Sequence, residues 1–307
     1  MRRLLSAVVS LSVALAACSG PGPRQPIAGP SIEEVLAKNP RLLWVAAHPD
    51  DESMAGGLLA RACVGLETPC HFLIFTEGAG GECFLEDGCK PDLASVRHRE
   101  LGRAARLYRA TLEHYEFFNA PLPVESFPSR PELERKWLSE GDPAGLVARA
   151  IRRFKPDLVV TLDAYQGFTG HPEHKAAAHF ALAGISRAAD PKQKSPAFAS
   201  EPPHRVTHVY HVQNKYWFMS LAGDPYDPKP YNEAFDSEQL CDVTPEGQAR
   251  SCRDVRDANT RAHRSQDGEM NAIRSTSKYW GTLYVRRLDP FGAEAAALVA
   301  EIGKAGR

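Results

Sequence analysis

The sequence predicts an α/β fold, a Rossmann-like and mostly parallel sheet with helices on both faces. Short apolar runs alternate with stretches of helical periodicity along most of the chain, as expected of strands joined by crossover helices. The runs are almost uninterrupted, as in 42–47 (Leu-Leu-Trp-Val-Ala-Ala), which is typical of strands buried on both faces. The length of 307 residues, 43% of them hydrophobic, suits one large domain behind a short N-terminal region.

The expected elements follow one another in order from residue 42. Strands are assigned where a short run is apolar, and helices where apolar residues recur three and four positions apart. They are strand 42–47, helix 52–62, strand 71–76, helix 94–109, strand 112–118, helix 132–154, strand 157–162 and helix 172–187. Alternation over 205–212 predicts a later strand with His208 and His211 at exposed positions, residues 254–272 predict a helix, and 282–285 an edge strand.

The N-terminus predicts export. Residues 1–17 read as a signal peptide, with two arginines before an apolar stretch that is too short to span a bilayer. The segment 15–18 (Leu-Ala-Ala-Cys) is similar to the bacterial lipobox, so we expect Cys18 to be the lipidated first residue of the mature protein. Ser19 is not a retention aspartate, which favours the outer membrane or the periplasmic face. The competing interpretation is an ordinary secretory signal, with Cys18 incidental.

We expect a flexible tether over residues 18–38, because residues 20–30 are rich in proline and glycine, and a single catalytic domain over 39–307. Apart from Cys18, six cysteines remain in close pairs, and an even number in an exported protein predicts disulfides. Six cysteines permit 15 connectivities, of which we expect the local one: Cys63 with Cys70, Cys83 with Cys89, and Cys241 with Cys252. A cysteine-ligated zinc site is disfavoured because no C-x-x-C pair occurs.

Charge argues against nucleic acid as a partner. The chain has 37 basic and 38 acidic residues, a net charge of -1, whereas nucleic-acid-binding domains usually carry a strong basic excess. No other apolar run is long enough to cross a membrane, so we expect membrane contact only through the N-terminal lipid.

Two clusters of histidine and acidic residues lie where an apolar run gives way to a helical pattern. Residues 48–52 (His-Pro-Asp-Asp-Glu) follow strand 42–47, and residues 171–174 (His-Pro-Glu-His) follow strand 157–162. Ligands bind at the carboxyl ends of the strands in an open α/β sheet, so the clusters can share one pocket. A catalytic zinc takes three protein ligands, commonly imidazole and carboxylate, and keeps one position for water. The sequence therefore predicts a metal site here.

Asp50 and Asp51 provide one more carboxylate than the metal requires. One of them can bind the metal while the other takes a proton from the metal-bound water, whose pKa zinc lowers to about 7. The alternative is that the pair caps the following helix, because acidic side chains satisfy free N–H groups there. Matching clusters at two strand ends favour the metal site.

These residues also resemble a known family. The segment 47–52 (Ala-His-Pro-Asp-Asp-Glu) matches the AHPDDE signature of the PIG-L/LmbE-like deacetylases, zinc enzymes that remove acetyl groups from N-acetylglucosaminyl and related compounds. Further stretches agree in order over roughly residues 40–285: 76–81 (Thr-Glu-Gly-Ala-Gly-Gly), 97–101 (Arg-His-Arg-Glu-Leu), 170–174 (Gly-His-Pro-Glu-His) and 262–266 (Ala-His-Arg-Ser-Gln). The resemblance implies the LmbE-like form of the α/β fold.

Carried over position by position, the resemblance implies His48, Asp51 and His174 as metal ligands and Asp50 as the general base. It further implies that His171 polarises the substrate carbonyl.

Four other positions are interpreted from the same comparison. Arg97 matches an arginine that contacts substrate, although a solvated or ion-paired surface arginine is the competing interpretation. Glu173 replaces the usual aspartate of the second cluster, and we expect its carboxylate to orient His171. Thr169 stands where some members have a tyrosine that assists at the oxyanion, and Tyr165 in the same loop is a candidate replacement. Asn119 stands where many relatives carry an aspartate that grips the sugar, so sugar specificity is not inherited.

The leading hypothesis is thus an exported, metal-dependent amide hydrolase on the bacterial cell envelope. Its expected substrate is an N-acetylated sugar or a small N-acyl compound, and its expected cofactor is Zn²⁺, although two histidines and one aspartate accept other divalent ions. The alternative is a non-catalytic, glycan-binding envelope lipoprotein that keeps the fold.

Overall fold

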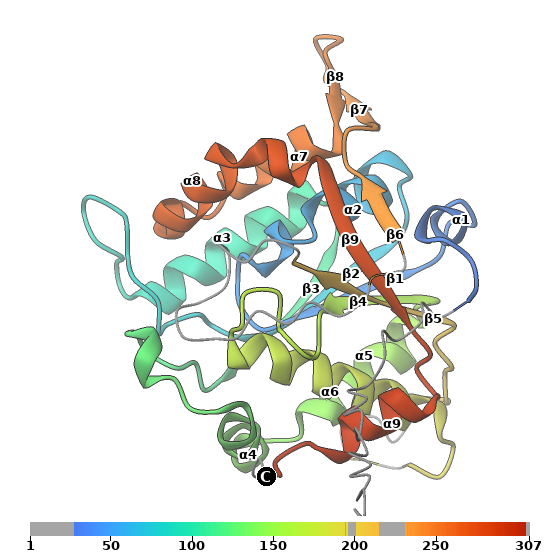
Figure 1. The fold of residues 1–307 in the computed structure, drawn as a ribbon. Coiled ribbons are helices and arrows are strands. Elements are labelled where there is room, and N and C mark those ends of the chain that lie inside the picture. The colour runs from blue at the N-terminus through green and yellow to red at the C-terminus, as the bar shows by residue number, and fades with distance from the viewer. Residues whose placement is uncertain (1–27, 194, 196–200, 215–230, 232, 305–307) are drawn as a thin grey trace, which may run out of the picture.

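A seven-stranded sheet forms the centre of the molecule (Figure 1). The computed structural model describes residues 28–193, 195, 201–214, 231 and 233–304. Across the sheet the strand order is β3 (Thr111–Phe117), β2 (Cys70–Thr76), β1 (Leu42–Ala46), β4 (Leu158–Leu162), β5 (His208–Gln213), β9 (Thr282–Leu288) and β6 (Glu233–Asp236). The strands β1 to β5 pair in parallel, and β9 is antiparallel to both of its neighbours. The predicted mostly parallel α/β fold is confirmed.

Helices cover both faces of this sheet (Figure 1). On one side lie α1 (Ile32–Leu36), α2 (Gly56–Leu59), α3 (Leu93–Leu107), α7 (Cys252–Thr260) and α8 (Asp267–Ser275). On the other lie α4 (Arg130–Glu140), α5 (Pro143–Phe154), α6 (Pro172–Ala189) and α9 (Ala293–Ala300). In β1, Trp44 belongs to the hydrophobic core on the first side and Val45 to the core on the second. Because successive strand residues point to opposite faces, a sheet covered on both faces requires the continuous apolar runs seen in the sequence.

Several element boundaries differ from the expectation. The helix expected over 132–154 is two helices, because α4 ends at Gly141, the Asp142 side chain caps α5, and Pro143 begins it. The helix expected over 254–272 is also interrupted, by a short 3-10 turn at Arg264–Gln266. The strand β9 is not the edge of the sheet, since β6 pairs with its outer side.

The strand β5 carries a further difference. His211 was expected at an exposed position and is completely buried, because β5 lies inside the sheet between β4 and β9.

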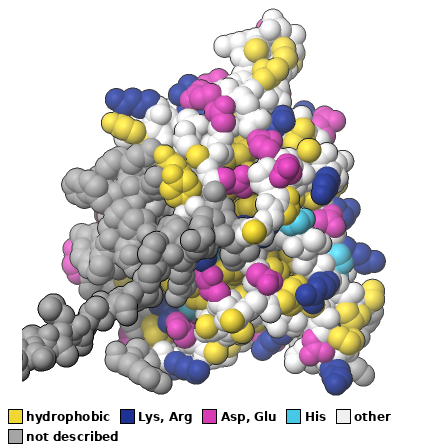
Figure 2. Space-filling model, turned by 45° about the vertical axis from the view of Figure 1, so that its right-hand side comes forward, with side chains coloured by type: hydrophobic (Ala, Val, Ile, Leu, Met, Phe, Trp, Pro, Cys, Tyr) yellow, Lys and Arg dark blue, Asp and Glu magenta, His cyan; other side chains and the backbone are white. Residues whose placement is uncertain are grey.

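A short hairpin of β7 (Leu240–Val243) and β8 (Ala249–Ser251) projects from the body of the molecule at the top of Figure 1. Hydrophobic side chains are visible on this projection in Figure 2, and Leu240 and Val243 are exposed there.

The packed domain begins earlier than residue 39. The helix α1 is capped by Ser31, and Ile32, Val35 and Leu36 are buried in the core on the α3 side. The expected flexible tether therefore cannot extend to residue 38. The expected signal peptide, 1–17, and Cys18 lie outside the described residues.

Three disulfides join the local cysteine pairs that the sequence predicted: Cys63–Cys70, Cys83–Cys89 and Cys241–Cys252. Within the described ranges, none of the helices has the length and apolar character required to span a bilayer.

Candidate active site

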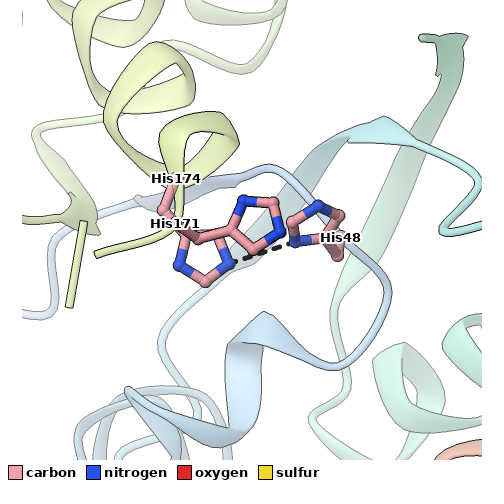
Figure 3. Close-up of side chains that lie close together, drawn as sticks. All are labelled: His48, His171 and His174. Atoms are coloured by element: carbon pink, nitrogen blue, oxygen red, sulfur yellow. Dashed lines mark hydrogen bonds between the residues drawn. The ribbon is translucent and has the colours of Figure 1, made fainter. Parts of the chain in front are cut away.

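The two histidine clusters meet because β1 and β4 are adjacent parallel strands. The first cluster follows the end of β1, and the second follows the loop after β4 and opens α6. Figure 3 shows the imidazole rings of His48, His171 and His174 side by side, with the latter two carried on the start of α6. Their ligand nitrogens all lie within 4.8 Å of one another. The expected convergence of the two strand ends is therefore observed.

A tighter triangle of candidate metal-ligand atoms, called the donor triangle below, includes an oxygen of Asp51. His48 Nδ1 lies 3.0 Å from His174 Nε2, and Asp51 Oδ1 lies 3.0 Å from the same His174 nitrogen and 3.5 Å from His48 Nδ1. Three ligands of a tetrahedral zinc ion, at the usual zinc–nitrogen and zinc–oxygen lengths, are separated by about 3.3 Å. This triangle has the dimensions of a zinc site.

The remaining polar atoms of these residues leave lone pairs in the triangle. His174 Nδ1 donates to the Gly167 carbonyl at 2.7 Å, and His48 Nε2 donates to Glu173, which assigns the free lone pairs to the facing nitrogens. Asp51 Oδ2 accepts the backbone N–H groups of Ala47 and His48, each at 2.9 Å. When each ring carries a single proton, the three facing atoms are all acceptors, so a proton or a metal ion between them stabilises the arrangement.

The electrostatics of the pair agree with a site for positive charge. Burial opposes the charged form of His48, but the carboxylates of Asp51 and Glu173 outweigh it and raise the pKa of His48 to about 10. Burial likewise opposes ionisation of Asp51, yet His174 and His48 hold the pKa of Asp51 well below its usual range.

Asp50 lines the same pocket as the triangle and is held by Arg97. Its backbone has φ 104°, in the left-handed region that aspartate tolerates better than most residues. Arg97 donates to Asp50 Oδ2 at 2.7 Å and to the carbonyls of Pro49 and Gly78. Burial raises the pKa of Asp50 to about 7, against the opposing charge of Arg97.

Neither aspartate caps the helix that follows. Asp50 makes no capping hydrogen bond, and Asp51 accepts N–H groups that precede it in the chain.

Arg97 is buried and paired, not solvated. Its side chain is 5% exposed and lines the pocket, and its two terminal nitrogens donate to Asp50 and to the two carbonyls. Gly78 has φ 70°, and a Cβ there would lie 2.5 Å from the guanidinium carbon of Arg97. Any residue larger than glycine at this position would therefore clash with the Arg97 side chain. Arg97 holds Asp50. Its expected contact with substrate stays a prediction, because the side chain also lines the pocket.

Glu173 also acts on a different partner from the one expected. Its carboxylate accepts from His48 Nε2, from Asn119 Nδ2 at 2.7 Å and from the Ala120 N–H at 2.6 Å. It therefore orients His48, while His171 Nδ1 accepts only the backbone N–H of Glu173, at 3.2 Å. Burial, together with the charges of His48 and His174, holds the pKa of His171 well below its usual range. His171 is a neutral ring with its proton on Nε2.

Asn119 uses both ends of its amide inside the protein. Its Nδ2 donates to Glu173, and its Oδ1 accepts the Gly80 N–H at 2.6 Å. An aspartate in this place would bring a second carboxylate against Glu173.

The tyrosine that was considered as a replacement does not serve the site. The Tyr165 hydroxyl donates to Glu294, and Tyr165 does not line the pocket. Thr169 lines it, with its hydroxyl 3.3 Å from His174 Nδ1.

Two buried pairs support the site and were given no role from the sequence. Glu52 Oε1 lies 2.5 Å from His263 Nε2, and Glu52 Oε2 accepts the Asp50 N–H at 3.1 Å. Glu100 accepts both the N–H and the hydroxyl of Ser265, at 2.9 and 2.6 Å. The signal was present, because these residues belong to the stretches 47–52, 97–101 and 262–266, but their pairing becomes visible only in the fold.

The donor triangle lies at the base of a pocket of about 430 Å³. Around the polar base its walls are largely apolar. The apolar side chains that line it are Met54, Ala120, Leu122, Val124, Phe127, Phe168, Met270, Ala272 and Ile273.

Residues 43–185 match the model of the PIG-L family, described as GlcNAc-PI de-N-acetylase, which confirms the predicted resemblance over this region. It is 28% identical over 186 residues to a mycothiol S-conjugate amidase of Streptomyces coelicolor, and 30% identical over 164 residues to a 1D-myo-inositol 2-acetamido-2-deoxy-alpha-D-glucopyranoside deacetylase of Geodermatophilus obscurus. These matches cover 56% and 49% of this chain and 60% and 54% of the relatives. The chain therefore spans little more than half the length of the curated relatives that it matches.

Solved structures share the fold at low sequence identity. They include N,N'-diacetylchitobiose deacetylase from Pyrococcus horikoshii, with 16% identity, a TM-score of 0.53, and coverage of 84% of this chain and 90% of that one. A conserved protein from Thermus thermophilus has 22% identity and a TM-score of 0.51 over 82% and 95% of the two chains. A 4-carboxy-2-hydroxymuconate hydratase from Pseudomonas putida has 15% identity and a TM-score of 0.52 over 82% and 97%. Because one of these folds carries a hydratase, the reaction of this chain has to be argued from its site.

Proposed function

We propose that this protein is a metal-dependent amide hydrolase that deacetylates an N-acetylglucosamine-containing or related N-acylated substrate. The observation that carries the proposal is the triangle of His48, Asp51 and His174 atoms together with the buried carboxylate of Asp50 in the same pocket. The similarity to sugar deacetylases and to an amidase supports the same reaction class.

His48, Asp51 and His174 would hold the ion, and zinc fits their spacing. When bound, such an ion supplies Lewis acidity towards the amide carbonyl and lowers the pKa of water to about 7. Asp50 takes the proton from the attacking water and returns it to the departing amine nitrogen. Arg97 fixes the direction of the Asp50 carboxylate during both transfers. His171, protonated on Nε2, donates to the carbonyl oxygen as negative charge develops there.

Two adjacent aspartates provide a matched test of these roles. The metal-loaded protein should release acetate from N-acetylglucosamine-containing compounds. Asp50→Asn should lower turnover by about 10²- to 10⁴-fold with the metal retained, since that is the range general acid–base catalysis supplies. Asp51→Asn should lose the metal along with the activity. If both variants keep the metal and the activity, another site performs the reaction.

The competing function is glycan binding without turnover. It predicts that glycan affinity survives in Asp50→Asn and that the metal-loaded protein releases no acetate from any glycan that it binds. The chain has both the expected general base, Asp50, and the donor triangle, and these features favour a hydrolase over a glycan-binding protein without turnover.

We further propose that the protein works outside the cytoplasm, anchored to the cell envelope through a lipid on Cys18. The three disulfides support an oxidising compartment, and the segment 15–18 supports the anchor. Cys18→Ala should release the protein from membranes or block its processing. Continued membrane retention with a normally trimmed N-terminus would contradict the lipid anchor.

A further inference from the structure

The pocket above the donor triangle has two walls of different origin. One wall is the segment 120–127, which contributes Leu122, Val124 and Phe127, and the other is α8, which contributes Met270 and Ile273. The segment begins beside the base of the pocket, because the Ala120 N–H donates to the Glu173 carboxylate. It ends there as well, because the Phe127 ring lies 4.7 Å from the His171 ring, centroid to centroid. This wall is therefore anchored on the His171 side.

The α8 wall is anchored on the Asp50 side. Met270 Sδ lies 3.6 Å from the hydroxyl of Ser53, in the short helix that follows Asp50. The neighbouring Glu269 and Gln266 also line this side of the pocket and offer it polar groups.

The two walls assign the two halves of an amide substrate. His171 meets the carbonyl oxygen and Asp50 meets the amine nitrogen, so the acyl group extends along 120–127 and the amine portion along α8. An acetyl group ends in one methyl, which leaves most of the apolar surface of Leu122, Val124 and Phe127 without an apolar partner. Removing apolar surface from water lowers the free energy.

The polar side chains at the foot of this wall contact other parts of the protein. The Asn119 amide contacts Glu173 and Gly80, and the terminal nitrogens of Arg97 contact Asp50 and two carbonyls. Thr169 faces His174. The wall side chains Leu122, Val124 and Phe127 offer a polar acyl substituent no hydrogen-bonding group, so burying such a substituent against them is disfavoured.

We propose that the site prefers an N-acyl group longer than acetyl, a hydrocarbon chain of several carbons held by Leu122, Val124 and Phe127. This inference rests on the proposed amide hydrolysis and names its substrate class.

A chain-length series tests the preference. Glucosamine carrying N-acetyl, N-butyryl, N-hexanoyl or N-octanoyl groups is supplied to the metal-loaded protein, and kcat/KM is measured from the released amine. Full burial of a methylene corresponds to about fourfold in binding, so hexanoyl should exceed acetyl by at least about tenfold even with partial burial. A kcat/KM that is flat or falls from acetyl upward would overturn the proposal.

A binding measurement separates this inference from the proposed reaction. The metal-loaded Asp50→Asn variant should bind N-hexanoylglucosamine at least about tenfold more tightly than N-acetylglucosamine in calorimetric titration. Tighter binding of hexanoyl with no turnover in the wild type would leave the acyl preference standing and remove the hydrolase assignment. Turnover of acetyl with equal affinities for both compounds would do the reverse.

Two leucines of similar exposure give the matched variants. Leu122 is 41% exposed and lines the pocket, whereas Leu107 is 52% exposed and lies at the end of α3, outside the pocket lining. Leu122→Ser should lower the hexanoyl-to-acetyl ratio of kcat/KM by about threefold or more, and Leu107→Ser should leave that ratio unchanged. Equal ratios in the two variants and the wild type would show that segment 120–127 does not hold the acyl chain.

Discussion

The base of the pocket and its wall are built in opposite ways. At the base, His174 is 3% exposed, and each polar atom of the donor triangle has a protein partner or faces another donor. In the wall, Leu122 is 41% exposed and contributes only apolar surface.

The difference separates two tasks. Buried hydrogen bonds hold the side chains at the base of the pocket, so the reacting groups keep one geometry. Metal binding and proton transfer require such a fixed geometry. A partly exposed apolar wall recognises by removing surface from water, and the size of the group it accepts can change without disturbing the chemistry. Substitutions at the base should therefore remove function, and substitutions in the wall should alter substrate choice.

The largest effect is expected from the triangle itself. His174→Ala removes a ligand, so both the metal content and the activity should fall to background. His171→Ala should keep the metal and lower turnover by about 10²- to 10³-fold, the usual cost of losing one donor to an oxyanion. Elemental analysis and acetate release check both variants. Loss of metal from His171→Ala with metal retained by Asp51→Asn would assign the site to the three imidazoles.

A large loss of stability is expected at Arg97. Arg97→Gln leaves the Asp50 carboxylate buried without its cation, and breaking a buried pair from one side costs about 3 to 5 kcal/mol. The control is Arg109→Gln, which breaks the exposed pair with Glu67 and should cost less than about 1 kcal/mol. Urea unfolding of the metal-free proteins gives both free energies. Equal losses of unfolding free energy in the two variants would show that the buried Arg97–Asp50 pair contributes no more to stability than the exposed Arg109–Glu67 pair.

Asn119→Asp tests whether the amide is required beside Glu173. The new carboxylate would repel Glu173, which orients the metal ligand His48, and loss of such support lowers metal affinity by about 10- to 100-fold. The exposed Asn271 on α8 provides the control, because Asn271→Asp adds the same charge away from the base. Competition with a chelator measures both affinities. Unchanged metal affinity in Asn119→Asp would show that the Asn119 amide does not support metal binding through Glu173.

The smallest expected effect concerns a buried group away from the pocket. Burial lowers the pKa of His211 to about 4, despite Asp163 at 4.0 Å, and Arg286 adds to the lowering. Above pH 6.5 the ring is neutral in both the folded and unfolded chains; below it, only the unfolded chain takes up the proton, until the folded pKa is reached. The stability that depends on neutral His211 is thus lost as the pH falls from 6.5 towards 4.

His211→Gln removes this titration. Between about pH 7.5 and about pH 5 the wild type should lose about 2 kcal/mol more unfolding free energy than the variant, as determined by urea unfolding at both pH values. Glu294 and His179 also act on the ring and remain in the variant, so the difference isolates His211. Identical pH dependence would show that the ring is not neutralised by burial.

The sequence by itself determined what depends on local pattern. Apolar runs predicted the strands β1 to β4, alternation predicted β5, the segment 47–52 located the candidate metal site, and the short separations within the cysteine pairs predicted the three disulfides. The break at Gly141 and Pro143 between α4 and α5 was also legible in the residues, although the periodicity was extended across it.

Only the tertiary structure decided which side chains meet across the fold. Arg97 lies on Asp50 from 47 positions along the chain, Glu173 on His48 from 125, and His263 on Glu52 from 211. The burial of His211 and the early start of the domain at α1 likewise depend on neighbours supplied by distant segments. The physical reason is that periodicity and composition record the free energy of burying a face, whereas a hydrogen bond or ion pair depends on distances that exist only after the chain has folded.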